Sequence, residues 1–276
     1  MKVLITGANG MLGQDLCPIL ENAGCCIIPT DYETMDVTNV DIVDEFVLKT
    51  HPDLIIHCAA YTNVDKAEED TEKAALLNVK GTENMALAAS KIDVPIIYIS
   101  TDYVFDGTKD TPYLPSDTPN PKSVYGKTKY EGELAIKKHC KKYYIARTSW
   151  LYGINGKNFV ETMISLAAKA PKEIKVVNDQ TGCPTWSVDL CYGILKLLTK
   201  PYGTYHLCGS EKTTWYGFAK KIFELENLNV NLIPCTTEEY PRPARRPKYS
   251  VMDNDNLLRP WQEALICYLK LRKENL

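Results

Sequence analysis

Tyr125 and Lys129, four residues apart, have the spacing that is most specific for chemistry in this chain. On a helix, residues four apart share a face, so the phenol and the ammonium would lie side by side. A free phenol is a weak acid at neutral pH, but a nearby ammonium favours the phenolate and lowers the pKa of the tyrosine. A decrease of about three units requires about 4 kcal/mol of differential stabilisation. The spacing therefore predicts a tyrosine acid–base catalyst assisted by a lysine.

Thr101 ends a predicted strand and is the third candidate for this site. Open α/β sheets bind their ligands at the carboxyl ends of the strands. There, the Thr101 hydroxyl would donate a hydrogen bond to a substrate carbonyl beside Tyr125. Each of the three residues alone is ordinary on a protein surface. Their combination with a nucleotide-binding turn makes catalysis the favoured interpretation.

That turn is the segment from Gly7 to Gly13, which contains Gly10 and has the spacing G-x-x-G-x-x-G. It lies between a predicted strand and a predicted helix, where glycines permit a tight turn and helix amides face a pyrophosphate. The spacing is one residue longer than the commonest dinucleotide fingerprint, and a plain tight turn is the alternative. The position in the first βα unit favours nucleotide binding.

Asp31 ends the second predicted strand, where a carboxylate accepts hydrogen bonds from an adenosine ribose. Its charge would repel a 2′-phosphate, and the glycine turn has no Lys or Arg to compensate. This favours NADH weakly over NADPH as the cofactor. The alternative is a solvated carboxylate at a strand end.

Short β-rich runs alternate with helical patterns in the first half of the chain, which is typical of βαβ units around a parallel sheet. We expect a doubly wound, Rossmann-like α/β fold with helices on both faces. Thr38 or Asn39 would begin the second helix. The expected strands are Lys2–Thr6, Cys25–Thr30, Asp53–His57, Val94–Ser100 and Tyr143–Arg147, and the expected helices are Met11–Asn22, Val40–Lys49 and Glu72–Ile92.

The pattern changes after Trp150, which suggests a smaller C-terminal lobe. A proline-rich loop precedes it between Ser100 and Val124, and a basic connector that cannot be helical runs from Pro241 to Pro247. We expect residues 1–150 to form the NAD(P)-binding domain, with added elements from about 174–200, and residues 151–276 to form most of the substrate-binding lobe. Further helices are expected at Asn158–Ala170, Thr185–Leu198 and Trp215–Leu225, with a strand at Thr204–Cys208.

The composition excludes several classes of partner. The 276 residues carry 32 Lys and Arg against 35 Asp and Glu, so a net charge of −3 offers no basic field for nucleic acid. No apolar run approaches the roughly 20 residues of a membrane span, and the N-terminus does not resemble a signal peptide. The ten cysteines lack metal-ligand or C-x-x-C spacing, which predicts reduced, mostly buried thiols in a cytoplasmic protein.

The chain resembles the extended short-chain dehydrogenase/reductase superfamily and, within it, the dTDP-4-dehydrorhamnose reductases. The resemblance covers most of the chain. The stretches Ser100–Gly107 and Arg147–Gly153 are specific to this branch. The other matching segments are Ile5–Gly13, Cys58–Asp65, Tyr125–Lys129, Asn178–Thr185 and Arg245–Pro247.

The resemblance implies reduction of the 4-keto group of dTDP-4-dehydro-6-deoxy-L-mannose to dTDP-L-rhamnose by NADH or NADPH. Tyr125 would protonate the developing alkoxide, Lys129 would bind the nicotinamide ribose and lower the tyrosine pKa, and Thr101 would orient the carbonyl. Together with Tyr125 and Lys129, the residues lining the cofactor would be Gly7, Gly10, Met11, Leu12, Asp31, Asp36, Val37, Ala59, Ala60 and Thr62.

On the substrate side, the same comparison implies that Val64, Asp102, Tyr103 and Trp150 face the sugar with Thr101. Trp150 is equally compatible with packing inside the lobe. The guanidinium of Arg246, with or without Arg245, suits a clamp for the nucleotide diphosphate. A solvated basic linker is the alternative.

Three departures from the family pattern limit the transfer. Some members hold Mg²⁺ at a dimer contact through acidic residues, but this chain has only Asp189 in that stretch, which predicts no metal. Cys183 replaces a smaller residue in its motif, a change we expect to be neutral. Asp253–Pro260 is shorter than the usual connection into the last helix. A homodimer is a family expectation, and His57 is expected to serve packing.

Two alternative functions stay open. One is a non-catalytic, cofactor-binding regulatory subunit similar to the methionine adenosyltransferase β subunit, against which the Tyr125–Lys129 pair argues. The other is reduction of a different nucleotide-linked 4-keto sugar, because lobe residues decide the substrate.

Overall fold

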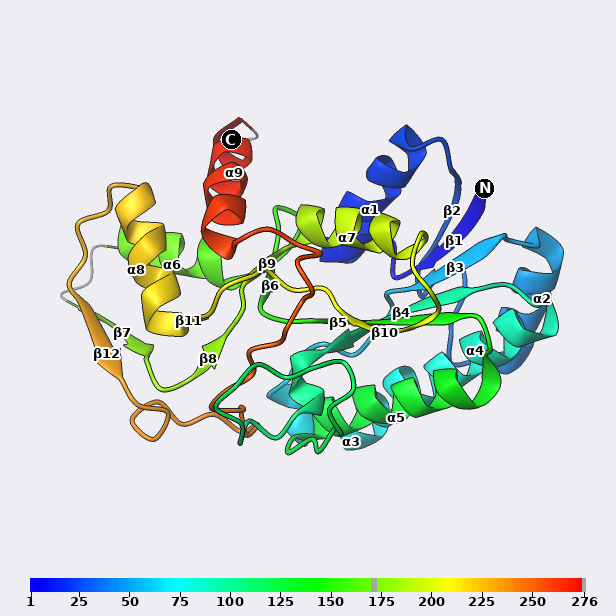
Figure 1. The fold of residues 1–276 in the computed structure, drawn as a ribbon, viewed down its shortest axis with the longest axis horizontal. Helices are drawn as coiled ribbons and strands as arrows, with labels where there is room; N and C mark the ends of the chain where they lie inside the picture. The colour runs from blue at the N-terminus through cyan, green and yellow to red at the C-terminus, as the bar shows by residue number, and fades with distance from the viewer. Residues whose placement is uncertain (170–172, 275–276) are drawn as a thin grey trace.

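The core of the protein is a six-stranded parallel sheet in the order β2-β1-β3-β4-β5-β10 (Figure 1). The computed structural model describes residues 1–169 and 173–274. Val3 in the first strand pairs with Ile27 on one side and with Leu54 on the other. The strands are β1 Lys2–Thr6, β2 Cys26–Thr30, β3 Leu54–His57, β4 Ile96–Thr101, β5 Tyr143–Thr148 and β10 Gly203–His206. The predicted Rossmann-like sheet is therefore confirmed.

Helices cover both faces of this sheet, because each face carries its own set of apolar side chains (Figure 1). Leu16 and Ile194 belong to the cluster on one face, and Val47 and Ile136 to the cluster on the other. The first face is covered by α1 Met11–Asn22 and α7 Ser187–Leu197, and the second by α2 Val40–Thr50, α4 Thr82–Lys91 and α5 Val124–His139.

The chain moves from β1 to β2 on one side and then returns to β3 on the other side of β1. The connections after β1 and β3 therefore diverge at the carboxyl ends of these strands, which is the place where open α/β sheets hold ligands. The glycine turn follows β1, and the segment from Cys58 to Asp65 follows β3. The topology alone thus places both predicted cofactor segments at one crevice.

A smaller lobe packs beside the carboxyl ends of the strands and has a third apolar cluster of its own (Figure 1). It contains α6 Phe159–Ala168, α8 Trp215–Leu225 and α9 Trp261–Glu274. Its strands form the pairs β7 Ile174–Val177 with β12 Leu232–Cys235, β8 Thr181–Gly182 with β11 Thr213–Thr214, and β6 Leu151–Tyr152 with β9 Thr185–Trp186. Of the elements within residues 174–200, α7 packs on the sheet, whereas β7, β8 and β9 stay in the lobe. The strand β10, which follows that range, joins the edge of the sheet.

Several element boundaries differ from the predictions for identifiable reasons. The helix expected from Thr185 begins at Ser187, because the two residues before it pair with β6. The helix expected over Glu72–Ile92 consists of α3 Thr71–Ala75, a π-helical segment Leu76–Gly81 and α4. The expected proline-rich loop contains a short 3-10 helix, Asp102–Val104. A second one spans Lys66–Glu68.

Side-chain caps fix other boundaries. Asn39, one of the two expected caps, accepts from the amides of Asp41 and Ile42 at the start of α2. Asn158 caps α6, and Ala170, the predicted end of that helix, lies outside the described residues. In the C-terminal connection, the buried Asn254 amide donates to the carbonyls of Cys208 and Leu258 at 2.6 and 3.1 Å. Among the described residues, no helix is long and apolar enough to cross a membrane.

Candidate active site

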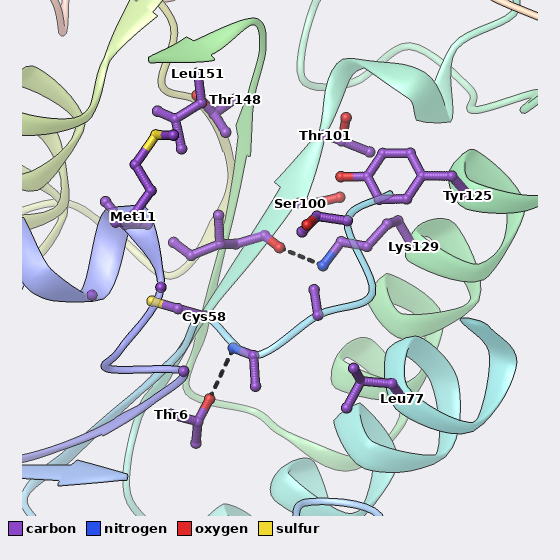
Figure 2. Close-up of a pocket in the computed structure, with 18 of the residues that line it drawn as sticks. Thr6, Met11, Cys58, Leu77, Ser100, Thr101, Tyr125, Lys129, Thr148 and Leu151 are labelled. Atoms are coloured by element: carbon purple, nitrogen blue, oxygen red, sulfur yellow. Dashed lines mark hydrogen bonds between the residues drawn. The ribbon is translucent and has the colours of Figure 1, made fainter. Parts of the chain in front are cut away.

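A cavity of about 650 Å³ opens at the carboxyl ends of β1, β3 and β4, between the sheet and the lobe (Figure 2). Every predicted catalytic and cofactor residue lines it, and so does every predicted substrate residue except Arg246. These lining residues are Gly7, Gly10, Met11, Leu12, Asp31, Asp36, Val37, Ala59, Ala60, Thr62, Val64, Thr101, Asp102, Tyr103, Tyr125, Lys129 and Trp150. Residues separated by up to 143 positions thus meet in one cavity.

The glycine turn has the geometry that its sequence predicts. Gly7 has a φ of +66°, and an added Cβ would lie 2.9 Å from the Ala59 backbone nitrogen, so only glycine fits this close approach. The Gly10 amide donates to the Gly7 carbonyl at 3.0 Å, and Gly10 is the N-cap residue of α1. The first amides of α1 therefore face the cavity without a side-chain cap, as an anion-binding helix terminus requires.

Asp31 is fastened to the glycine turn rather than free. One carboxylate oxygen accepts from the amides of Glu33 and Thr34 at 3.1 Å, and the other accepts from the Asn9 side chain. The hydrogen bond from the Thr34 amide is the main reason why the pKa of this exposed carboxyl is lowered. The Asp31 carboxyl is thus an anion at neutral pH, and this negative charge is what would repel a 2′-phosphate. Asn9 itself was not predicted as a site residue.

The segment after β3 is held against the cavity by polar side chains. The Ala59 amide donates to the Thr6 hydroxyl at 3.1 Å (Figure 2). The Tyr61 amide donates to the Asn78 side chain at 2.8 Å, and Asn78 belongs to the π-helical segment. A π-helical turn holds one residue more than an α-helical turn, and Asn78 is a buried residue of this turn. Burial and nearby Lys129 lower the pKa of His57 to about 3, so the imidazole is neutral.

Tyr125 and Lys129 project from one face of α5 into the cavity, and Thr101 lies on the same side (Figure 2). Helix α5 begins in this position because the Ser123 hydroxyl accepts from the Gly126 amide at 3.1 Å. The Lys129 ammonium donates to the Ile99 carbonyl at 2.7 Å and lies 4.1 Å from the centre of the Tyr98 ring. The predicted catalytic trio is therefore assembled.

Burial dominates the pKa values of Tyr125 and Lys129 in this structure, and the lowering of the tyrosine pKa by Lys129 together with a cofactor ribose stays a prediction. Burial raises the pKa of Tyr125 to about 12, against a hydrogen bond with Thr101 that lowers it. Burial lowers the pKa of Lys129 to about 7, although Glu133 opposes this change. Both charged forms lose hydration inside the protein, and this loss is the largest cause of both changes. Tyr125 is therefore a neutral phenol at physiological pH.

Behind the trio lies a fully buried ion pair that the sequence analysis did not include. Arg147 donates through Nε and Nη2 to the two oxygens of Glu133 at 2.8 and 2.7 Å. The Ser100 hydroxyl donates to Glu133 at 2.6 Å. Glu133 stands four residues after Lys129 and so lies on the same face of α5. The spacing of four residues from Lys129 is the feature of the sequence that could have indicated Glu133.

Aromatic side chains form the lobe side of the cavity. Trp150 has a φ of +46° and stacks on Trp215, with 3.6 Å between ring centres. An added Cβ on Gly182 would lie 2.5 Å from the Trp150 ring, so the lobe backbone supports this indole closely. Trp150 therefore lines the cavity and also packs in the lobe, and its contact with the sugar stays a prediction. Tyr103 contacts the Tyr125 ring edge-on at 5.5 Å.

Asp102 is a buried acid beside Thr101. Burial raises the pKa of its carboxyl to about 6, against hydrogen bonds with Ser250 and Thr101. The Thr101 hydroxyl donates to this carboxyl at 3.0 Å and accepts from the Tyr103 amide at 3.2 Å. These contacts fix the direction of the Thr101 side chain at the cavity wall.

Arg246 lies outside the cavity lining and pairs with Asp65 through Nη1 and Nη2 at 2.8 and 2.9 Å. The one carboxylate of the stretch considered for a metal, Asp189, is paired with Arg259, which donates through Nε and Nη2. Among the described residues, no group of three or more His, Cys, Asp or Glu is arranged to hold a metal ion. Further lining residues that the sequence analysis missed include Lys157 and Trp215.

Comparison with known proteins agrees with this geometry. A family model described as the RmlD substrate binding domain matches residues 1–271. The spore coat polysaccharide biosynthesis protein SpsK of Bacillus subtilis (strain 168) is 41% identical, over 98% of each chain. The dTDP-4-dehydrorhamnose reductase of Escherichia coli (strain K12) is 40% identical, over 92% of this chain and 90% of that protein.

Solved structures give the same result. The dTDP-4-dehydrorhamnose reductase of Clostridium acetobutylicum ATCC 824 superposes with a TM-score of 0.96 at 47% identity, over 99% of this chain and 100% of that one. The dTDP-4-dehydrorhamnose reductase of Bacillus anthracis str. Ames, in complex with NADP, superposes with a TM-score of 0.94 at 43% identity, over 98% and 99%. This chain belongs to the dTDP-4-dehydrorhamnose reductase family of extended short-chain dehydrogenases/reductases.

Proposed function

We propose that this protein reduces the 4-keto group of dTDP-4-dehydro-6-deoxy-L-mannose to give dTDP-L-rhamnose, with NADH or NADPH as reductant. The observation that carries the proposal is the convergence of Thr101, Tyr125 and Lys129 on a cavity whose opposite wall is the glycine turn. Substrate ketone and nicotinamide must meet between these two walls. Residues of both walls line the same cavity.

The residues present suit a dinucleotide. The close approach at Gly7, which a Cβ would fill, and the uncapped amides of α1 form a cradle for the diphosphate. Asp31 would accept from the adenosine ribose, and Lys129 would donate to the nicotinamide ribose. When bound, the reduced nicotinamide supplies the hydride that reaches the carbonyl carbon.

The raised pKa of Tyr125 suits a reductase. A proton donor has to be protonated before the reaction, and a phenol with a pKa of about 12 is protonated throughout the physiological range. The alkoxide that develops at the substrate oxygen is a far stronger base than a phenolate, so proton transfer from Tyr125 is favourable. This donor stabilises charge that exists only as hydride arrives, and so acts on the transition state.

We propose that NADH is preferred over NADPH. The support is Asp31, a carboxylate fixed by four donors at the end of β2, where it would repel a 2′-phosphate. A relative at 43% identity holds NADP in its crystal structure. Measuring kcat/KM with NADH and with NADPH therefore tests the preference directly. Equal kcat/KM for the two would refute the preference.

The lobe is proposed to bind the nucleotide sugar through Val64, Asp102, Tyr103 and Trp150, while residues 1–150 with α7 and β10 hold the cofactor. We also propose a homodimer in the cytoplasm. The ten free thiols, five of them buried and four partly buried, support a reducing compartment. Light scattering that reports a single 31.1 kDa chain at micromolar concentration would refute the dimer.

The test is oxidation of reduced nicotinamide that depends on the dTDP-sugar. Wild type should turn over, and Tyr125→Phe, which removes only the hydroxyl, should lose at least 100-fold in kcat because the proton donor is gone. Cofactor affinity of that variant should stay within threefold. Product analysis with dTDP-, UDP- and GDP-linked 4-keto sugars identifies the nucleotide.

The regulatory alternative predicts a different outcome. Wild type and Tyr125→Phe would then be equally silent, and a pull-down would recover a stoichiometric partner enzyme. That combination would overturn the reductase assignment.

A further inference from the structure

Asp65 and Arg246 join two segments that are 181 residues apart, at the edge of the cavity. Asp65 ends the segment after β3, directly after the lining residue Val64. Arg246 lies on the proline-rich connector between the lobe strand β12 and the last helix. The two side chains are 26% and 20% exposed, so solvent screens this pair only in part.

Asp65 holds more of the connector than one side chain. Besides the two bonds from Arg246, it accepts from the Ala244 amide at 3.2 Å, and Arg242 lies 3.9 Å away. On the far side, the connector is seated against Gly107, where an added Cβ would lie 2.7 Å from the Pro247 Cα. The connector is thus fixed at both ends of the segment that carries Arg246.

The chemistry of guanidinium leaves one edge of Arg246 for another anion. Five N–H donors form two forks, one made by the two terminal nitrogens and one made by Nε and Nη2. Asp65 takes the terminal fork, and the remaining Nη1 hydrogen goes to the Ala244 carbonyl at 3.1 Å. The Nε–Nη2 fork points away from Asp65. Tyr103, which lines the cavity, is a further hydrogen-bonding partner of the Arg246 side chain, so this fork faces the cavity wall and a diphosphate would join or replace the phenol there.

We propose that Asp65 is a positioning residue, which holds Arg246 by one fork so that the other fork meets the diphosphate of the nucleotide substrate. The inference rests on the proposed function and gives Arg246 a fixed direction that a solvated linker would lack. A planar fork that is already held loses little entropy on binding a phosphate, because its side chain is ordered beforehand. Asp65 itself need not touch the substrate.

The first experiment measures binding of dTDP alone by calorimetry to wild type and Asp65→Asn. The asparagine keeps the size of the side chain but removes the charge and one acceptor, so Arg246 is no longer held. We expect the Kd for dTDP to rise about tenfold and the KM for the dTDP-sugar to rise equally. The kcat should stay within twofold, because the reacting atoms are untouched. An unchanged Kd would overturn the proposal.

A double-mutant cycle with Arg246→Gln separates positioning from general damage. If Asp65 acts through Arg246, the charge change at Asp65 should have no further effect on dTDP affinity in the Arg246→Gln background. A full tenfold effect in that background would refute the proposed route.

Asp189→Asn is the matched control. Asp189 also forms a two-bond pair with an arginine, through Nε and Nη2 of Arg259 at 2.9 and 2.8 Å, and neither residue lines the cavity. It should lower the Tm about as much as Asp65→Asn and leave dTDP affinity unchanged. Equal losses of affinity in both variants would show that the Asp65 effect is only structural.

Arg246→Lys covers the case in which Asp65→Asn does not fold. It keeps the positive charge and the bond from Ala244 to Asp65 but removes the fork, and we expect about a tenfold rise in the Kd for dTDP. Wild-type affinity in this variant would overturn the proposal. A wild type that binds dTDP but fails to oxidise reduced nicotinamide would instead refute the proposed function, whatever the result for Asp65.

Discussion

The substitution Lys129→Met should make the protein more stable at neutral pH and remove its activity. Lys129 is 2% exposed, and burial lowers its pKa from 10.5 to about 7. In the unfolded chain, the lysine stays protonated up to its ordinary pKa. Between these two values the unfolded state binds more protons than the folded state, so stability rises with pH.

The magnitude follows from the size of this pKa decrease. At pH 7 the buried lysine costs about 4 kcal/mol relative to a neutral side chain. Methionine removes that cost but leaves the Ile99 carbonyl without its donor, which costs about 1–3 kcal/mol. The free energy of unfolding of Lys129→Met should therefore exceed that of wild type by about 2 kcal/mol at pH 7. The advantage should shrink by about 1.4 kcal/mol per pH unit towards pH 9.

Urea unfolding of both proteins at pH 7, 8 and 9, followed by tryptophan fluorescence, measures this difference. Lys127→Met is the control, because Lys127 is exposed on the same helix. Its stability should parallel that of wild type at all three pH values. A difference between Lys129→Met and wild type that does not change with pH would refute the argument from burial.

Three further predictions concern the charges around the site. Glu133→Gln leaves the buried Arg147 without its counter-charge, so urea unfolding should show a free energy of unfolding lower by about 3–5 kcal/mol. The control Glu224→Gln breaks an exposed pair with Lys221 and should lower the free energy of unfolding by less than about 0.5 kcal/mol. Equal losses in the two variants would contradict this prediction. Lys157→Gln should raise the Kd for reduced nicotinamide about fivefold in a fluorescence titration. Lys157 lines the cavity, and a phosphate contact by an exposed cation contributes about 1 kcal/mol. An unchanged Kd would show that Lys157 does not belong to the cofactor site. Asp31→Ser should raise kcat/KM with NADPH relative to NADH about fivefold or more, as loss of a repelled charge requires, and an unaltered ratio would refute the role of Asp31.

The sheet and the core of the site could be predicted because their signals are local. Alternating apolar strands, the glycine turn before Met11 and the spacing of Tyr125 and Lys129 all lie within one or two turns of chain. Parallel topology then brings the strand ends together. Every predicted cofactor residue consequently lines the cavity.

Other features depend on pairings that a linear pattern does not contain. The strands β6, β8, β9 and β11 have two residues each and exist only through partners far away in the chain. The Asp65 carboxylate and Trp215 acquire their partners, Arg246 and Trp150, only after the lobe docks. The π-helical turn at Asn78 adds one residue to a helix without a visible break in its pattern.

The direction of the Tyr125 pKa also depended on the fold. Spacing indicates that a lysine is near, but the cost of burying both groups is set by the surrounding walls. Lys129 is directed at the Ile99 carbonyl, so its ammonium is partly satisfied by the backbone. The spacing of two residues on a helix therefore does not show how deeply either side chain is buried, and burial dominates the pKa of Tyr125.

The strand β10, at the edge of the sheet, is synthesised only after β6 to β9 and α6 of the lobe. On the ribosome, β5 emerges more than fifty residues before its neighbour, so the nascent chain carries an open sheet edge while residues 151–202 are synthesised. Apolar side chains of α1 stay uncovered over an even longer stretch of synthesis, until Leu190 and Ile194 of α7 are made. Unpaired strand edges attract other chains. A gene truncated near codon 150 should therefore yield an aggregating product, and the two halves of this molecule depend on each other from translation onwards.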